Sequence, residues 1–166
     1  MIKTDRIHPN NWLAMLVIFV AITGTGTSNA DQAGNITIAA LTSWLEAYGD
    51  AWESRDPDKA AVLFSSNSSY QVTPYEKAHI GQNGVRRYWA GVTENQRNVQ
   101  FQSQALSVTG NSGIAHWSAK FDVEPDGTRI ELDGIFVLEF DQNGKCRRLR
   151  EWWHLRSEGA EAGSQK

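Results

Sequence analysis

The side chains best suited to chemistry lie near the end of the chain, where Glu151 stands among large aromatic residues. Alternate residues of a strand share a face, so Glu151 shares one with Leu149 and Trp153. The opposite face carries Trp152 and His154. A carboxyl group that faces an apolar, Trp-lined cavity loses hydration, which raises its pKa and makes it a candidate general acid or base. Alternatively, Glu151 pairs with an arginine or lies at an open rim.

Other kinds of site have no support in the sequence. His, Cys, Asp and Glu do not cluster at the spacing that metal ligands need, so we expect no metal site. Gly24-Thr25-Gly26 lies in the N-terminal segment and forms no phosphate-binding loop, so we expect no cofactor. The single cysteine, Cys146, falls inside a predicted strand, where we expect it to be buried and inert.

Residues 1–30 are typical of a secretory signal peptide. Lys3 and Arg6 precede an apolar run over 12–22, and Ser28-Asn29-Ala30 ends the segment with small and polar residues. The run is about half the length of roughly 20 residues that spans a bilayer. We therefore expect cleavage after Ala30 and a secreted or periplasmic protein without membrane association. A retained N-terminal membrane anchor is the alternative.

The rest of the chain is predicted to form one domain over 31–157, followed by a disordered tail over 158–166. The formal net charge of the whole chain is −3. A mildly acidic domain has no broad electrostatic attraction to nucleic acid, so we expect no nucleic-acid partner.

The sequence predicts helices in the first part of the domain and long strands in the second part. Apolar spacing predicts helices over 36–54, 57–64 and 83–92. Asp56 and Pro57 suit the cap and first residue of the second helix. The predicted strands are 68–73, 99–109, 113–124, 129–141 and 145–155. This order predicts an α+β domain.

Asn143-Gly144 joins the last two predicted strands and is a strong hairpin signal. A tight two-residue hairpin turn needs positive φ at both central residues, and this pair tolerates it. We therefore predict a two-residue turn at this position.

The strand over 129–141 carries apolar residues on both faces, with Phe136 on one and Ile135 and Val137 on the other. A strand of this kind is covered on both sides. We expect the helices to cover one face and a second copy of the chain to cover the other, which would give a homodimer through the outer sheet face.

Five segments occur in an order and at a spacing typical of one known superfamily. They are 48–57, Leu63-Phe64, 81–89, Val108-Thr109-Gly110 and 133–153. Together they resemble the nuclear transport factor 2-like superfamily, in particular its SnoaL-like bacterial members. The resemblance implies a cone-shaped, strongly curved antiparallel sheet wrapped around the N-terminal helices, as in cystatin-like rolls. It also implies a pocket at the open end and dimers through the outer sheet face.

The resemblance implies positions for the catalytic groups of the steroid isomerase branch, which uses a tyrosine, a protonated Asp and a carboxylate base. Tyr48 occupies the position of the tyrosine. The base position falls near Val72 or Thr73, and the position of the protonated Asp falls on Phe136. Because two of the three groups are missing, we do not expect a steroid isomerase.

The resemblance also implies catalytic groups typical of two further branches. The scytalone dehydratase branch uses paired histidines, but His116 and His154 are expected to lie at the surface or in an interface. The epoxide hydrolase branch needs an Asp-Arg-Asp cluster in the pocket, and Asp133, Arg148 and Arg150 are expected to face outward.

The resemblance to the isomerase branch implies that Glu151 and Trp153 face the pocket. A bulge near Arg147-Arg148 would reverse this parity and turn Trp152 and His154 inward. Asp133 and His154 would then become the catalytic candidates.

Aromatic residues from the predicted elements are expected to line the pocket: Trp52, Tyr88, Trp89, Trp117, Phe121, Phe136 and Trp153. Tyr48 and Glu151 would be its few polar groups. We therefore expect a protein that binds a small apolar or aromatic molecule. One alternative is a cofactor-independent isomerase, dehydratase or cyclase with Glu151 and Tyr48 as the acid–base pair. The other is a dimeric interaction module with a filled pocket.

Overall fold

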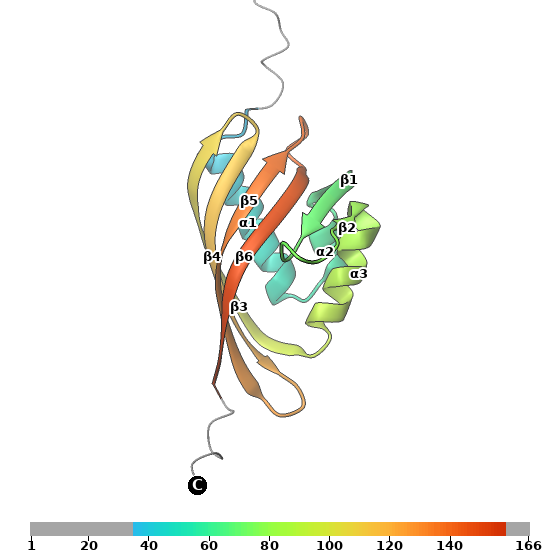
Figure 1. The fold of residues 1–166 in the computed structure, drawn as a ribbon, viewed down its shortest axis with the longest axis vertical. Helices are drawn as coiled ribbons and strands as arrows, with labels where there is room; N and C mark the ends of the chain where they lie inside the picture. Colours follow the sequence, from blue (N-terminus) through green and yellow to red (C-terminus); the bar gives the residue numbers. More distant parts are fainter. Residues whose placement is uncertain (1–34, 159–166) are drawn as a thin grey trace, which may run out of the picture.

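A computed structural model describes residues 35–158 of the protein (Figure 1). The predicted signal peptide lies outside this range, as does all but the first residue of the predicted tail. Helices precede a set of long strands, which confirms the predicted α+β class. The elements are α1 (Ile38–Glu53), α2 (Pro57–Ala61), β1 (Phe64–Gln71), β2 (His79–Ile80), α3 (Gly81–Thr93), β3 (Gln96–Thr109), β4 (Ser112–Val123), β5 (Thr128–Phe140) and β6 (Cys146–Glu158).

All six strands form one sheet in the order β2-β1-β6-β5-β4-β3. The neighbours β3, β4, β5 and β6 pair antiparallel, as predicted. The strand β1 pairs in parallel with β6, and Tyr70 stands beside Leu149. The prediction of an entirely antiparallel sheet is wrong at this one pairing, which places an early strand next to the last one.

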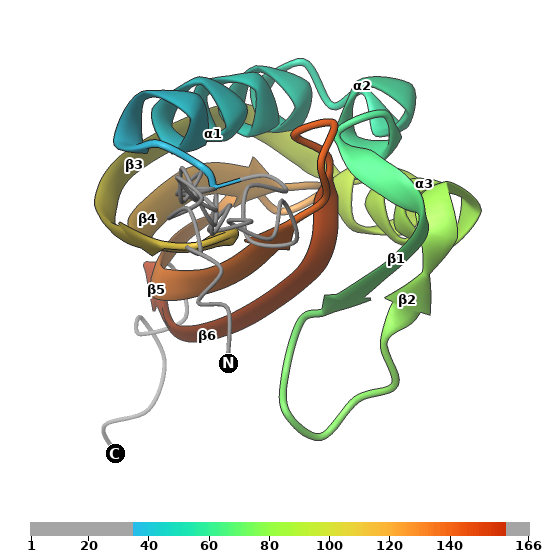
Figure 2. The same ribbon diagram turned by 90° about the horizontal axis from the view of Figure 1, so that it is seen from above.

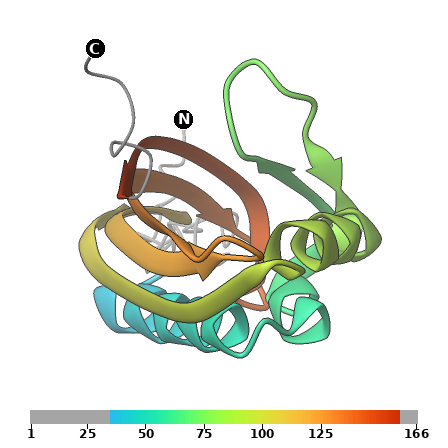
Figure 3. The same cartoon turned by 90° about the horizontal axis from the view of Figure 1, so that it is seen from below.

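The sheet is strongly curved and wraps around the helical side of the molecule (Figures 2 and 3). The helix α1 packs against β3, and α3 packs against β1 and α2. The sheet is not closed, because β2 and β3 remain its two edges. The predicted cone-like architecture is confirmed, with the helices on the concave side.

Local hydrogen bonds explain where the first two helices begin. The Thr37 hydroxyl accepts a hydrogen bond from the Ala40 amide at the start of α1. Asp56 accepts hydrogen bonds from two free amides of α2, and Pro57 fills the first helical position, as predicted. The helix α2 is shorter than predicted, because Phe64 leaves it to pair with Cys146.

The turn between β5 and β6 is longer than predicted. Only Gly144 has a positive φ, of 71°, and Asn143 does not. The Gly144 amide bonds the Asp141 carbonyl at 3.1 Å, and the Asp141 carboxylate accepts from the Asn143 and Lys145 amides. The two-residue turn is therefore wrong, because the side chain of Asp141 organises a wider loop.

A bulge interrupts β6 at Arg147. Glu139 pairs with Arg148 and Phe140 pairs with Cys146, so Arg147 is the extra residue. The bulge reverses the parity of Cys146, which is buried, and leaves the strand beyond it with the parity inferred from the resemblance. The alternative in which the bulge turns Trp152 and His154 inward is wrong for this reason.

The core is rich in aromatic side chains. The inward face of β4 carries Ala115, Trp117, Ala119 and Phe121, all buried as the alternation predicts. Cys146 is buried, and burial raises the pKa of its thiol, as expected of an inert cysteine. Within residues 35–158, no helix has the length and apolar character required to cross a bilayer.

Candidate functional site

A cavity of about 170 Å³ lies between the inner face of the sheet and the helices α1 and α3. Among residues 35–158, its wall contains one acidic side chain, Glu151, and no basic one. The aromatic residues of the wall are Tyr48, Trp52, Tyr70, Tyr88, Trp89, Trp117, Phe121 and Trp153. The remaining lining residues are Val72, Val92, Gln96, Leu132 and Leu155. We call this space the aromatic cavity.

Glu151 is the acidic group of the aromatic cavity, and its side chain is almost completely buried, with 4% of the residue exposed. The Tyr70 hydroxyl donates a hydrogen bond of 2.8 Å to its Oε1 atom. Burial raises the pKa of Glu151 to about 8, although the Tyr70 hydrogen bond opposes the rise. Glu151 is therefore a neutral acid over much of the pH range near 7.

Tyr48 and Tyr70 form a short hydrogen-bonded chain that ends on Glu151. Their hydroxyl oxygens lie 3.0 Å apart, and both residues are buried. A hydroxyl has one proton, so Tyr70, which donates to Glu151, accepts from Tyr48. Burial, and next the charge of Glu151, raises the pKa of each phenol well above its usual value, which keeps both hydroxyls protonated.

The second carboxylate oxygen of Glu151 is the free end of this chain. Among the described residues, Oε2 has no hydrogen-bond partner, whereas Oε1 is bonded to Tyr70. When Glu151 is neutral, the geometry favours its proton on Oε2, because Oε1 already accepts a hydrogen bond. The group can thus donate a proton when it is neutral and accept one when it is ionised.

Comparison with known proteins places this chain in a known family. The family model described as the SnoaL-like domain matches residues 45–149. The chain belongs to the SnoaL-like domain family. A search of the curated proteins gives no match to it.

Solved structures with the same fold share little sequence with this SnoaL-like protein. A protein with a cystatin-like fold from Methylobium petroleophilum is 19% identical, with a TM-score of 0.58, and the match covers 80% of this chain and 86% of that one. A protein of ketosteroid isomerase-like fold from Catenulispora acidiphila, solved with trimethylamine, is 14% identical, with a TM-score of 0.59 and coverages of 70% and 86%. The Δ5-3-ketosteroid isomerase of a Mycobacterium species is 13% identical, with a TM-score of 0.61 and coverages of 72% and 98%. These identities establish the fold alone.

Six of the seven aromatic residues expected in the pocket line the cavity of this SnoaL-like protein. The seventh, Phe136, is fully buried beneath it. Its ring stacks on Trp117 at a centroid distance of 4.9 Å and meets the edge of Tyr48 at 5.2 Å. The expectation that Phe136 lines the pocket is wrong, because these two rings of the wall pack against it.

The other predicted candidates lie outside the aromatic cavity. Asp133 is exposed on the outer sheet face and contacts His116, with 3.0 Å between Oδ2 and Nε2. His154 is exposed on the same face, opposite Asp133 in the register of β5 and β6. Both residues are therefore separated from Glu151 by the sheet.

Sequence reasoning missed Tyr70, the residue that touches Glu151. The signal was present, since Ser68, Tyr70 and Val72 share one face of the predicted strand and the isomerase comparison places the base position near Val72 or Thr73. The missing information was the parallel pairing of β1 with β6, which brings Tyr70 beside Leu149 and within reach of Glu151.

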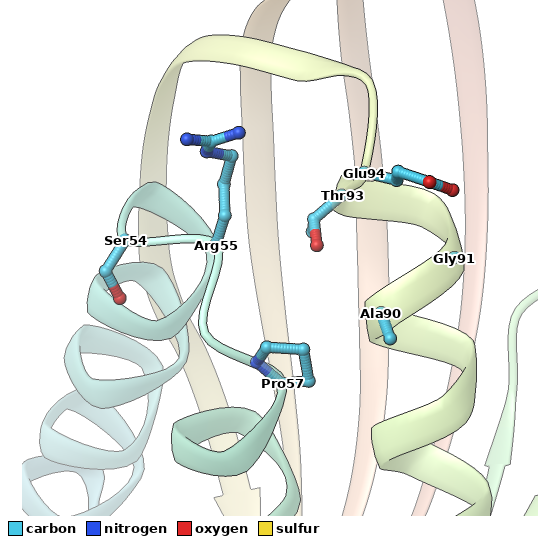
Figure 4. Close-up of a pocket in the computed structure, with 7 residues that line it drawn as sticks. All are labelled: Ser54, Arg55, Pro57, Ala90, Gly91, Thr93 and Glu94. Atoms are coloured by element: carbon cyan, nitrogen blue, oxygen red, sulfur yellow. The ribbon is translucent and has the colours of Figure 1, made fainter.

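A larger, open hollow of about 600 Å³ lies between the α1–α2 turn and the end of α3 (Figure 4). Three of its polar side chains donate to the protein backbone: Ser54 to the Asp50 carbonyl, Arg55 to the Gln96 carbonyl and Thr93 to the Trp89 carbonyl. None of the buried, unpartnered side-chain atoms of the described residues belongs to its lining. The hollow therefore offers no chemistry comparable with that of Glu151.

Among the residues 35–158, no group of three or more His, Cys, Asp or Glu side chains is placed to hold a metal ion. The aromatic cavity itself offers hydrogen bonding, proton transfer at Glu151 and contact with aromatic rings.

Proposed function

We propose that this protein binds a small, mainly apolar molecule in the aromatic cavity, with one polar group of the ligand at Glu151. The observation that carries the proposal is the composition of the wall, which combines eight aromatic residues with one buried acid. Ligand sites are typically apolar cavities with a few polar groups that fix orientation.

The size of the cavity limits the ligand. An engineered apolar cavity of about 150 Å³ accommodates benzene, and sites for drug-sized ligands begin at about 300 Å³. At about 170 Å³, the aromatic cavity fits a molecule or a molecular end near the size of a single ring. A whole steroid exceeds this space.

Native mass spectrometry of the protein purified from its own host tests this proposal. We expect a small molecule that stays bound to the folded protein and is released on denaturation. The variant Val72→Phe places a ring in the cavity wall and should lose the molecule, whereas Val62→Phe, at an exposed position, should keep it. A folded wild-type protein that carries no small molecule, and binds none of a set of ring-sized ligands, would contradict the proposal.

A second candidate function is acid–base catalysis without a cofactor, as in an isomerase, dehydratase or cyclase. The specific observation in its favour is Glu151, whose pKa near 8 and unpartnered Oε2 suit proton transfer close to neutral pH. Tyr48, expected above as the second member of the acid–base pair, has its hydroxyl engaged with Tyr70, so both tyrosines would position this carboxyl group rather than act on the substrate.

Exchange of carbon-bound protons for deuterium in small cyclic ketones, followed by NMR in D₂O, tests the catalytic candidate. Catalysis predicts faster exchange with the wild type than with Glu151→Gln, and equal rates for the wild type and Asp133→Asn. Equal rates for all three folded proteins would count against Glu151 as an acid–base group on these substrates.

We also propose that the protein is exported, with cleavage after Ala30, and that it forms a homodimer through the outer sheet face. The intact mass of the host-purified protein measures the cleavage site. Support for the dimer comes from Ile114 and Trp152, which are exposed on the outer face although both are large and apolar. The interaction-module alternative predicts the same dimer but no bound molecule.

A further inference from the structure

We infer that the polar group of the ligand is a small ammonium cation, tertiary or quaternary, enclosed by the aromatic rings and neutralised by the Glu151 carboxylate. This inference rests on the proposed binding function and specifies the chemical class of its ligand. The wall of the aromatic cavity combines aromatic rings with one acid, and its described residues include no basic group and few free hydrogen-bond donors.

The wall of the aromatic cavity is acidic. Its described lining residues include one acid and no Lys, Arg or His, so they carry no basic group that would attract an anion. Aromatic rings carry negative charge on their faces and attract cations, and a set of such rings is a known means of recognising methylated ammonium groups. A buried carboxyl group among eight aromatic residues adds the matching charge.

The described wall has few free hydrogen-bond donors for a neutral acceptor such as a carbonyl oxygen. The indole N–H groups of Trp52 and Trp153 donate to Gln96 and to the Val72 carbonyl. Those of Trp89 and Trp117 are unpartnered among the described residues, but each nitrogen has less than 1 Å² of accessible surface and is sealed from the cavity.

The tyrosine hydroxyls add few hydrogen-bond donors for a ligand. The hydroxyls of Tyr48 and Tyr70 are directed along their chain toward Glu151, so neither has a proton left for a ligand. In the part of the wall that the structure describes, only the Tyr88 hydroxyl and the Gln96 amide group remain as donors alongside Glu151 itself. A carbonyl ligand would thus depend on a single neutral acid, whereas a cation would use the whole wall.

The tyrosine chain is directed toward Glu151. Its two aligned hydroxyl protons stabilise a negative charge on Glu151, yet burial holds the group neutral because none of the described lining residues is basic. An ammonium ion in the cavity supplies the missing charge. Binding of a permanent cation therefore favours the ionised acid and releases one proton to water.

The pH dependence of binding follows from the groups around Glu151. Tyr48 faces it from α1, Tyr70 from β1 and Tyr88 from α3, and burial raises the pKa of each of these phenols. His79 of β2 stacks behind Tyr88, at 4.5 Å between ring centroids, and its pKa is lowered by burial. Between pH 7 and pH 8, Glu151 is consequently the group whose ionisation controls the affinity for a cation.

Calorimetric titration of the full chain with a matched pair of ligands tests the inference. The pair is choline and the uncharged alcohol in which a quaternary carbon replaces its nitrogen. At pH 8 we expect choline to bind at least about tenfold more tightly than the neutral alcohol. The affinity for choline should rise about 50-fold from pH 6 to pH 8, because the ionised share of an acid with a pKa of about 8 rises by that factor.

Variants assign the effect to Glu151. Glu151→Gln should remove the preference for choline and its pH dependence while leaving the weak binding of the alcohol. Asp133→Asn removes an equal charge from the outer face and should keep the preference. If Glu151→Gln fails to fold, Tyr70→Phe provides the test, because loss of this hydrogen bond should move the rise in choline affinity to higher pH.

The outcomes separate the two proposals. Binding of the neutral alcohol as tightly as choline would overturn the ammonium inference and leave the proposed binding function standing. Failure of the folded wild type to bind choline at pH 8 would also overturn it. The host-purified protein would then decide the binding function by whether it carries another small molecule.

Discussion

At the scale of single residues, Glu151 is an acid that the fold keeps neutral. Its pKa rises because burial removes the water that would stabilise its charge, and the hydrogen bond from Tyr70 compensates only in part. The folded protein therefore binds a proton at pH values where the unfolded chain has lost it. This difference links the stability of the protein to pH.

The free energy of unfolding should depend on pH through the titration of Glu151. The pKa of Glu151 is higher in the folded than in the unfolded state, so its contribution is most favourable at or below the unfolded pKa and is lost as pH rises toward 8. Between pH 6 and pH 8, the wild type should lose roughly 2 kcal/mol of unfolding free energy relative to Glu151→Gln. Urea unfolding of both proteins at the two pH values measures this, and parallel profiles would contradict it.

Tyr70 should affect both stability and the titration of Glu151. The variant Tyr70→Phe leaves the buried Tyr48 hydroxyl without its partner and removes the donor to Glu151. We expect a loss of about 1–3 kcal/mol of unfolding free energy and a further rise in the pKa of Glu151. Unfolding curves and carboxyl NMR titration give the two values. Tyr75→Phe is the matched control, since Tyr75 is 97% exposed and should change neither.

At the scale of elements, Gly134 of β5 allows the strands that form the cavity wall to approach closely. A Cβ atom at this position would lie 2.6 Å from the Trp152 carbonyl oxygen, 2.8 Å from the Trp153 Cβ atom and 3.0 Å from Trp117. Two of these atoms are backbone or next to it and cannot move without shifting β6. The glycine thus sets how closely two tryptophans of the cavity wall can pack.

Gly134→Ala should destabilise the protein by about 1–3 kcal/mol and displace Trp153, which would also weaken ligand binding. For Gly91→Ala in α3 we expect the opposite effect, a gain in stability. A Cβ atom there meets nothing within 4 Å, so better helix propensity should stabilise the protein by roughly 0.5–1 kcal/mol. Thermal unfolding of both variants tests the pair, and equal effects would refute the steric explanation for Gly134.

Local features of the helices and strands can be predicted from the sequence, whereas features that depend on long-range strand pairing cannot. Periodicity located α1 and the inward face of β4, because helical spacing and strand alternation are local properties. The Asn143-Gly144 turn was placed correctly but with the wrong geometry, since the carboxylate of Asp141 reorganises it. Tyr70 was missed because its role depends on a pairing between strands far apart in sequence.

At the scale of the whole molecule, the two faces of the curved sheet differ in the side chains that they carry and in what those side chains are suited to bind. Its concave face encloses the aromatic cavity, while its outer face carries charged side chains together with Trp152, which is 45% exposed. Ile135 lies beside Trp152 in the register of β5 and β6, and it is only half-buried. An outer face with such residues is suited to a second copy of the chain.

Trp152→Glu should convert the expected dimer to a monomer without affecting the aromatic cavity, because Trp152 and Glu151 point to opposite sides of β6. Size-exclusion chromatography with light scattering measures the mass, and ligand titration checks the cavity. Tyr75→Glu introduces the same charge at an exposed aromatic residue of a loop and should leave the dimer intact. A monomeric wild type would rule out the homodimer.

The parallel pairing of β1 with β6 also has a consequence for the nascent chain. Tyr70 and Glu151 are 81 positions apart, and the bond between them needs β6, the last strand of the described residues. A domain emerges from its N-terminus onward, so the helices and most of the sheet can be present before the site exists. A ligand of this cavity would therefore recognise only a chain that already contains β6, and its binding would stabilise the protein only after β6 has been synthesised.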